Sequence, residues 1–433
     1  MLHDPSHQPV YPAAAEIRLS EKEKNILKSL AAKIARYAED PVNAERAVLW
    51  QKLNDLEAER PLVWINEIPW HEMNWDDELT LQCASPWARQ HETVLRRMIY
   101  QWEHMQGDMI INPYITCPLA IYSSDFGILE DVDIARTDDD NDIYSRHFKI
   151  QIKEPEDIAK IKMPVVEHNE LATEYAFAAM QDLYRDILPV RKEGQTHIWF
   201  TPWDFLIRWW GVQEAMLDLV LRPDMVNEAV SRMVDAWMVE LDQFEEQNLL
   251  SLDCNNTRIG SGGYGYTSEL PGRDFDENRV RPINMWGCSN AQIFSEVSPE
   301  MHWEFALRHD MRWLERWGLT YYGCCEPLGR KIHILEKIGN LRKISVSPWN
   351  DTATVVENIG DRYVHSRKPN PAVLATDTWD PDQAEKDIRD YLEAAKGCHV
   401  ELIMKDISTV RYEPQRLWEW ADIASRLAME QHN

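Results

Sequence analysis

The chain has 433 residues, and 46 Lys and Arg against 73 Asp and Glu leave a formal net charge of −27. A surface this acidic repels phosphate backbones, and no basic stripe interrupts it, so we expect no nucleic-acid partner. There is no apolar run long enough to cross a bilayer and no basic-then-apolar leader, so we expect no membrane association and a cytoplasmic location.

Helices come first along the chain. Ser20 precedes the acidic Glu21 and Glu23, and apolar residues then recur at helical spacing. A second helix is expected from about residue 41 to 56. Residues 1–58 are therefore predicted to be an N-terminal tail followed by a helical extension.

From residue 59 to 433, strand-like and helical segments alternate, which favours a parallel sheet with helical crossovers. We predict an α/β fold of the (β/α)8 TIM-barrel type. Nine segments have strand character, one too many for a barrel, and we assign 282–289 to the return of a long loop after the fourth strand. A doubly wound open sheet is the rival, but its nucleotide signature does not follow the first strand. The nine segments are 61–68, 108–115, 196–203, 249–256, 282–289, 319–326, 342–349, 362–366 and 399–407.

A glycine-rich run, GSGGYG, occupies 260–265 and formally contains G-x-G-x-x-G. A dinucleotide site needs a helix to begin there, whereas Pro271 and Gly272 soon follow and break helices. We therefore expect 256–281 to be a mobile loop over the barrel mouth.

The run GLTYYGCCEPLGRK (318–331) brings two thiols and a carboxyl to a strand end. Strand alternation predicts Cys324 and Glu326 on one side and Cys325 on the other. Cysteine sulfur and carboxylate oxygen are ligands that Zn²⁺ accepts. The alternative is two buried cysteines acting as small apolar groups, with Glu326 in an ion pair.

Several segments follow the pattern of a known superfamily. PLVWINEIPW (61–70) resembles the first barrel strand of the uroporphyrinogen decarboxylase superfamily, and RWWGVQEAMLDLVLRPDMVNEAV (208–230) resembles its Gly-containing helix pair. SEVSPEMHWEFALRHDMRWLERWGL (295–319) resembles its SPE helix. YYGCCEPL (321–328) stands where the methyltransferase branch has a strand ending in H-x-C-G, and DPDQAEKDIRDYLEAAKG (380–397) resembles the helix before the last strand. The resemblance covers roughly residues 58–430.

The resemblance implies a corrinoid-dependent methyltransferase of the O-demethylase type. Uroporphyrinogen decarboxylases carry arginines after the first strand to hold a polycarboxylate, whereas this chain has Asn66-Glu67-Ile68-Pro69-Trp70. The branch implies transfer from a small methyl donor, such as an aryl methyl ether, to the cobalt of a separate corrinoid protein. It also implies a homodimer.

The branch further implies zinc, with Cys324, Cys325 and Glu326 in the H-x-C position. No cysteine ends the last strand, where Lys405-Asp406 stand, so Asp406 is the further candidate ligand. The alternative function is a decarboxylase-like lyase or a metal-free small-molecule-binding barrel.

Methyl transfer to cobalt requires activation of the leaving group, by a metal or by a proton donor. Cys324 and Glu326 fit the role of holding a metal, and Glu67, His71 or Asp204, each just past a strand end, fit the role of proton donor. The residues predicted to contact the substrate are Trp70, Trp203, Asn256, Trp286, Cys288 and Trp349.

Overall fold

The computed structural model describes residues 17–135 and 145–431, so residues 1–16 of the expected N-terminal tail lie outside it. The chain divides into two compact units, each built from separate stretches of sequence. Among the described residues, the first unit comprises 121–135, 145–167 and 195–367; the second comprises 17–120, 168–194 and 368–431. The boundary at residue 58 stays a prediction.

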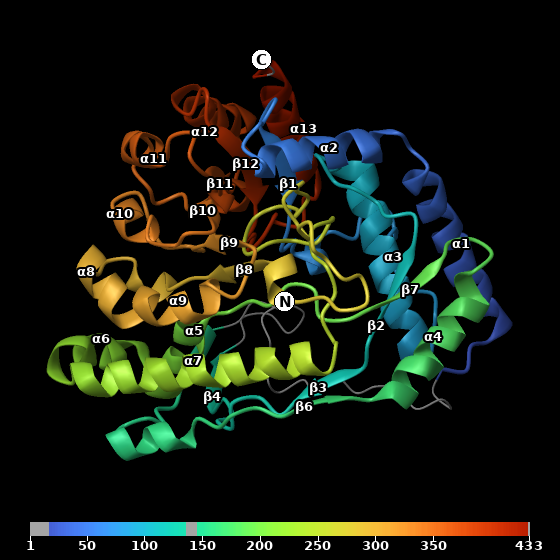
Figure 1. The fold of residues 1–433 in the computed structure, drawn as a ribbon. Coiled ribbons are helices and arrows are strands. Elements are labelled where there is room, and N and C mark those ends of the chain that lie inside the picture. Colours follow the sequence, from blue (N-terminus) through green and yellow to red (C-terminus); the bar gives the residue numbers. More distant parts are fainter. Residues whose placement is uncertain (1–16, 136–144, 432–433) are drawn as a thin grey trace. The chain divides into compact units, whose positions relative to one another are not determined.

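The second unit contains the expected N-terminal helices, α1 (Glu21–Ala38) and α2 (Val42–Asn54). Helix α1 begins with a capping box. The Ser20 side chain accepts a hydrogen bond from the Glu23 backbone N–H, and the Glu23 carboxylate accepts one from the Ser20 backbone N–H. Helix α1 packs against α3 and α4 around a shared apolar cluster (Figure 1). The unit's other helices are α3 (Pro86–His104), α4 (Glu170–Tyr184), α12 (Pro381–Ala394) and α13 (Gln415–Glu430).

Two parallel strand pairs complete the second unit. Strand β1 (Leu62–Ile65) pairs with β12 (His399–Met404), and β2 (Ile115–Pro118) pairs with β7 (Val190–Glu193). Because β1 and β12 are parallel, the segments that follow the two strands lie at the same edge of the sheet.

The strand expected over 108–115 does not form. Side chains of helix α2 take up its backbone hydrogen bonds: Ile111 N donates to Asn43 Oδ1 at 2.8 Å, and Arg46 donates to Met109 O at 2.9 Å. The buried backbone is thus satisfied without a neighbouring strand.

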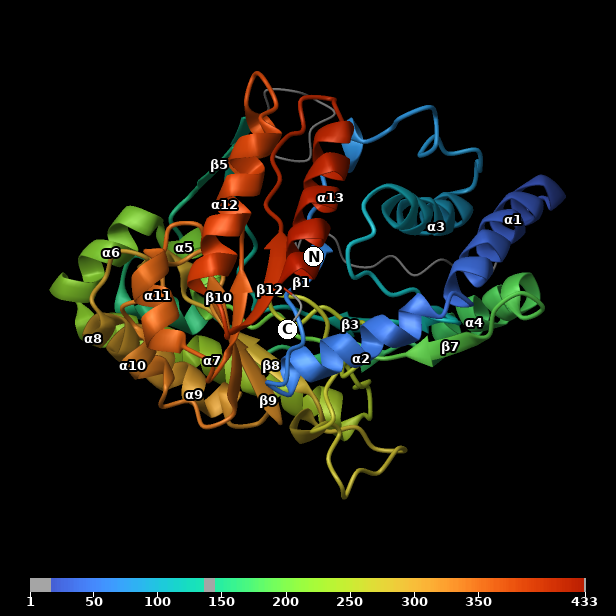
Figure 2. The same ribbon diagram turned by 90° about the horizontal axis from the view of Figure 1, so that it is seen from above.

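The first unit contains a parallel sheet in the order β11-β10-β9-β8. Figure 2 shows helices, among them α9 and α11, lying along these strands. The strands are β8 (Trp286–Ser289), β9 (Leu319–Tyr322), β10 (Leu341–Val346) and β11 (Val364–Arg367). The helices are α5 (Pro202–Trp210), α6 (Val212–Leu221), α7 (Pro223–Glu246), α8 (Pro299–His302), α9 (Arg308–Leu314), α10 (Ile332–Leu335) and α11 (Thr352–Ile359).

Four short strands precede that sheet in the chain. Strand β4 (Val132–Ala135) pairs antiparallel with β5 (Ser145–Phe148). Strand β3 (Ile121–Ser123) pairs with β6 (Val166–His168). A π-helical turn, Trp303–Leu307, joins α8 to α9. No helix in the described ranges has the length and apolar character needed to span a bilayer.

The fold is therefore α/β with a parallel sheet, as predicted, but several strand assignments besides 108–115 were wrong. Segment 282–289, assigned to a loop, contains β8, which pairs with β9. Segment 196–203 contains no strand, and segment 249–256 contributes only a bridge between Leu250 and Gln195. The Asp253 carboxylate accepts the Trp286 N–H at 3.0 Å, so a side chain from 249–256, rather than a strand backbone, binds β8 here.

The glycine-rich run is a packed segment, which contradicts the prediction of a mobile loop over all of 256–281. Residues 259–265 are buried, and only the later part, from 271 to 281, is mostly exposed. A Cβ on Gly260 (φ +56°) would overlap the ring of Tyr321 in β9. Glycine is required here because the backbone passes directly over that ring.

We predict that Gly260→Ala destabilises the protein by about 2–4 kcal/mol, from crowding and a left-handed backbone together. Gly272→Ala is the matched control, because Gly272 also has positive φ (+90°) but no atom of the described residues lies within 4 Å of its Cβ position. Denaturant unfolding should show the smaller loss for the control. Equal losses would mean that the Tyr321 contact contributes nothing.

Candidate functional site

The Cys324–Glu326 segment lies just beyond β9. The strand ends at Tyr322 because Gly323 adopts φ +98°. Alternation therefore stops before Cys324, and the Cys324 and Cys325 sulfurs lie 3.5 Å apart. The prediction that the two cysteines face opposite sides was wrong for this reason.

Glu326 is fully buried and held by backbone donors. Its Oε2 accepts from Cys324 N at 2.8 Å, and its Oε1 accepts from Ala291 N at 3.2 Å. Burial raises the pKa of this carboxyl despite these bonds, and the nearby carboxyl of Asp204 raises it further. The protonated form of Glu326 is thereby favoured.

Asp204 lies in the first turn of α5 and is also buried. Its Oδ2 accepts from Gln292 Nε2 at 2.8 Å, and burial raises its pKa. Among the described residues, Asp204 Oδ1 and Asn290 Nδ2 have no hydrogen-bond partner. Buried polar atoms left without a partner are costly, so a bound group is expected to satisfy them.

We call Asp204, Asn290, Gln292 and Glu326 the carboxyl cluster. The segment after β8 connects it, since Ala291 N binds Glu326 and the Gln292 side chain binds Asp204. Sequence reasoning found the two acids but missed Asn290 and Gln292. Recognising β8 as a strand would have placed both at a strand end.

A buried hydrogen-bonded chain lies near Glu326. Lys331 Nζ donates to Phe294 O at 2.5 Å and to His302 Nδ1 at 3.3 Å, and His302 Nε2 lies 2.6 Å from the Tyr322 hydroxyl. Burial lowers the pKa of Lys331 to about 8 and that of His302 to about 3, so this imidazole is neutral. Glu326 partly opposes the effect on Lys331.

A second buried group surrounds His197. Gly260 N donates to His197 Nε2 at 2.8 Å, and His197 Nδ1 lies 3.6 Å from Asp253 Oδ2. The acceptor role of Nε2 places a proton on Nδ1, facing the carboxylate. The Cys288 thiol donates to Ile198 O at 3.4 Å and is completely buried.

The predicted substrate-contacting aromatics differ in their surroundings. The Trp203 and Trp286 indoles are buried, and both donate at 2.8 Å to backbone carbonyls, those of Phe305 and Gly265. These two residues pack the core of the first unit. Trp349 is 68% exposed, and Asn256 is half-buried.

In the second unit, Glu67 and Asp406 follow the parallel strands β1 and β12 and meet. Asp406 N donates to Glu67 Oε2 at 3.3 Å, and Lys405 Nζ lies 2.7 Å from Asp406 Oδ2 and 3.4 Å from Glu67 Oε2. Both acids have positive φ, 51° and 55°. Burial, reinforced by Glu67, raises the pKa of Asp406.

The loop after β1 contains two further predicted residues, Trp70 and His71, and the acid Glu72. Glu72 accepts from Thr409 Oγ1 at 2.7 Å and from Val410 N at 2.7 Å, which fixes the segment after β12. His71 lies beside it, with Nε2 3.6 Å from Glu72 Oε1. Trp70 is half-buried and lies against Tyr100 and under the guanidinium of Arg97.

The predicted metal ligands do not form a set within either unit. Cys324, Cys325 and Glu326 belong to the first unit and Asp406 to the second. Among the described residues no group of three or more His, Cys, Asp and Glu is arranged to hold a metal. Both Glu326 oxygens already accept backbone hydrogen bonds. We therefore derive no chemical step from a bound zinc ion.

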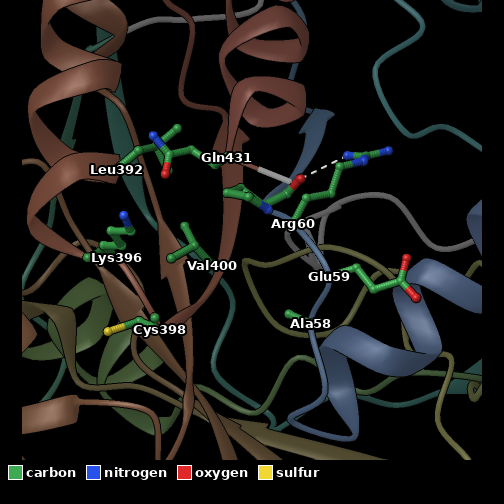
Figure 3. Close-up of a pocket in the computed structure, with 11 residues that line it drawn as sticks. Ala58, Glu59, Arg60, Leu392, Lys396, Cys398, Val400 and Gln431 are labelled. Carbon is green, nitrogen blue, oxygen red and sulfur yellow. Dashed lines mark hydrogen bonds between the residues drawn. The ribbon is translucent and has the colours of Figure 1, made fainter. Parts of the chain in front are cut away.

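A small hollow lies at the amino ends of β1 and β12, the edge opposite to Glu67 and Asp406 (Figure 3). Its volume of about 30 Å³ leaves room for only a few water molecules. Arg60, on its wall, donates to Pro61 O at 2.8 Å and binds Asp108 at 2.5 Å. The hollow is too small for an organic substrate.

Asp310, close to the carboxyl cluster, is a buried acid whose titration should make the stability of the protein depend on pH. It accepts from Ser289 Oγ at 2.7 Å, and burial raises its pKa from 3.8 to about 7. Its protonated form thus stabilises the fold fully below about pH 4, and this contribution is lost as pH rises toward 7.

We predict that the unfolding free energy of the wild type, minus that of Asp310→Asn, falls by up to about 4 kcal/mol between pH 4 and 7. Asparagine keeps an acceptor for Ser289 but does not titrate. Denaturant unfolding of both proteins across this range provides the measurement. A constant difference would show that Asp310 titrates normally.

No protein-family profile matches the chain, and no curated protein sequence matches it. Among solved structures, a methyltransferase from Methanosarcina mazei is similar with a TM-score of 0.46 and 12% sequence identity. That alignment covers 89% of this chain and 97% of the methyltransferase.

Proposed function

We propose that the chain transfers a methyl group from a small donor, an aryl methyl ether foremost, to the cobalt of a separate corrinoid protein. The proposal includes a (β/α)8 barrel, with the first unit's site at the carboxyl ends of its strands. Its sequence support is the superfamily pattern over residues 58–430 and the absence of the decarboxylase arginines.

The carboxyl cluster is the observation that carries the proposal. Reduced cobalt is a strong nucleophile, so the difficult part of the reaction is departure of the oxygen from the methyl carbon. The cobalt electron pair forms the new Co–C bond, the C–O pair goes to oxygen, and a proton must neutralise that oxygen. A carboxyl group whose pKa is raised by burial is suited to donate this proton at neutral pH.

Asp204 is the proton donor in this scheme, because its Oδ1 is the cluster's buried oxygen without a partner in the described chain. Glu326 is tied to two backbone N–H groups and so holds the segments after β8 and β9 in place beside Asp204, whose own pKa is raised by burial. Asn290 Nδ2 supplies a hydrogen bond to the departing oxygen or to a neighbouring substituent.

A Lewis-acidic metal on the ether oxygen is the other route to leaving-group activation. The sequence predicted zinc for that route, with Cys324, Cys325, Glu326 and Asp406 as ligands, but these residues do not form a ligand set within either unit. Elemental analysis of protein purified under anoxic, reducing conditions separates the two routes. Stoichiometric zinc would assign activation to the metal.

We predict that Asp204→Asn lowers turnover by roughly 10²–10⁴-fold, because the amide cannot donate the required proton. Glu326→Gln should also lower turnover while changing KM less, since it acts on the leaving-group step. Glu315→Gln, an exposed substitution in the same unit, is the control and should retain turnover.

The assay follows cobalt methylation by absorbance, with reduced corrinoid protein and a panel of methoxylated aromatics and methylamines. If no donor methylates cobalt, methyl transfer is refuted. Consumption of uroporphyrinogen instead would establish the lyase alternative. Unchanged turnover in Asp204→Asn would remove Asp204 as the proton donor.

A further inference from the structure

The adjacent thiols of Cys324 and Cys325 have a geometry that the proton-donor route to methyl transfer does not use. Their sulfurs lie 3.5 Å apart, although side chains of consecutive residues in a strand point to opposite faces. The turn at Gly323 produces this arrangement. Cys324 is fixed from the backbone side, because Ser345 Oγ donates to its carbonyl at 2.5 Å.

We infer that Cys324 and Cys325 are a modification site that forms a reversible vicinal disulfide by exchange with a small-molecule disulfide. Closing the bond brings the sulfurs from 3.5 Å to about 2.05 Å, which side-chain rotation and a local peptide adjustment supply. Cys325 is half-buried and Cys324 only 6% exposed, so Cys325 meets the external disulfide first.

The exchange balances in two steps. The Cys325 thiolate attacks the external disulfide, whose S–S bond breaks and releases one thiol. The Cys324 thiolate then attacks the Cys325 sulfur of the mixed disulfide, forming the Cys324–Cys325 bond and releasing the second thiol. The protein loses two electrons and the two thiol protons, and the external disulfide gains both.

The product is a strained bond, and strain makes it reversible. Consecutive Cα atoms are about 3.8 Å apart across a trans peptide, short of the 4.4–6.8 Å usual in disulfides. Strained disulfides are more easily reduced and are typical of regulation rather than of scaffolding. Thiol reductants should therefore reopen the ring.

Ring closure also acts on the carboxyl cluster. Glu326 Oε2 accepts from the N–H of Cys324, so a shift of the adjoining peptides weakens this bond. Oxidation should then stop turnover reversibly. This last consequence rests on the proposed function, whereas formation of the bond does not.

Three other cysteines serve as comparisons in the experiment. Burial raises the pKa of Cys117 to about 11 and that of Cys254 to about 11, which leaves little reactive thiolate at either residue. Cys398 is half-buried, far along the chain, and serves as a control for non-specific oxidation.

The test treats the full reduced chain with oxidised glutathione, alkylates remaining thiols and digests with trypsin. Cleavage after Arg316 and Arg330 gives one peptide, Trp317–Arg330, that contains both cysteines and no other. We expect this peptide unalkylated and lighter by two hydrogens, and restored by dithiothreitol. An alkylated peptide, or one carrying glutathione, overturns the inference.

Two variants and a second thiol reagent show whether misfolding, rather than loss of the thiol pair, explains a failure to form the disulfide. Cys398→Ser should form the bond as the wild type does, whereas Cys325→Ser should never yield the lighter peptide. Phenylarsine oxide, which bridges paired thiols, should stay on the wild type through a monothiol wash and leave with dithiothreitol. Loss in the monothiol wash also contradicts the inference.

The mass measurement separates this inference from the proposed function. If the bond forms but no donor methylates cobalt, only methyl transfer fails. If methyl transfer occurs and the peptide stays reduced, only the disulfide fails. Where both hold, turnover should disappear on oxidation and return with dithiothreitol.

Discussion

The hydrogen bonds from Ala291 N and Cys324 N to the buried Glu326 carboxyl are the interaction on which the candidate site depends. They join the segment after β8 to the segment after β9 through one side chain. Because a buried carboxyl without donors would be costly, the backbone of both segments is restrained to satisfy it. The position of Gln292, and through it of Asp204, follows from that restraint.

Burying so many polar groups costs stability that the apolar core must offset. The first unit buries Asp253, Asp310, Lys331 and Lys343 as well as the carboxyl cluster. Each has an internal partner; Lys343, for instance, donates to Tyr264 O at 3.2 Å. Such groups raise stability little, and ionisable groups with shifted pKa values that gather in one interior are typical of functional sites.

The periodic spacing of apolar residues predicted the helices and strands whose structure depends on local interactions. Ser20 before the acidic Glu21 and Glu23, with the helical spacing that follows, predicted α1, and the apolar segments predicted β1, β9, β10 and β12. It failed where a distant side chain takes over a backbone hydrogen bond, as Asn43 does for Ile111 and Asp253 does for Trp286. Hydrophobic pattern carries no information about such long-range replacements.

The candidate site shows the same division. Glu326 and Asp204 were identified because polar residues after apolar runs are conspicuous, and Glu67 and Asp406 meet because β1 and β12 are parallel neighbours. The side to which Cys325 turns depended on one dihedral angle at Gly323. Glycine permits that angle without requiring it, so sequence alone does not reveal it.

The π-helical turn Trp303–Leu307 has a consequence for comparing this chain with others. In a regular helix His302 and Asp310 would be about 80° apart around the axis, at 3.6 residues per turn. The turn absorbs one extra residue and reduces this to about 20°, so both side chains face the interior and reach Tyr322 and Ser289. A homologue lacking the bulge would keep both contacts with one residue fewer. Its alignment to this chain therefore needs a single-residue gap within 303–307, and an ungapped alignment would misplace every residue on one side of it.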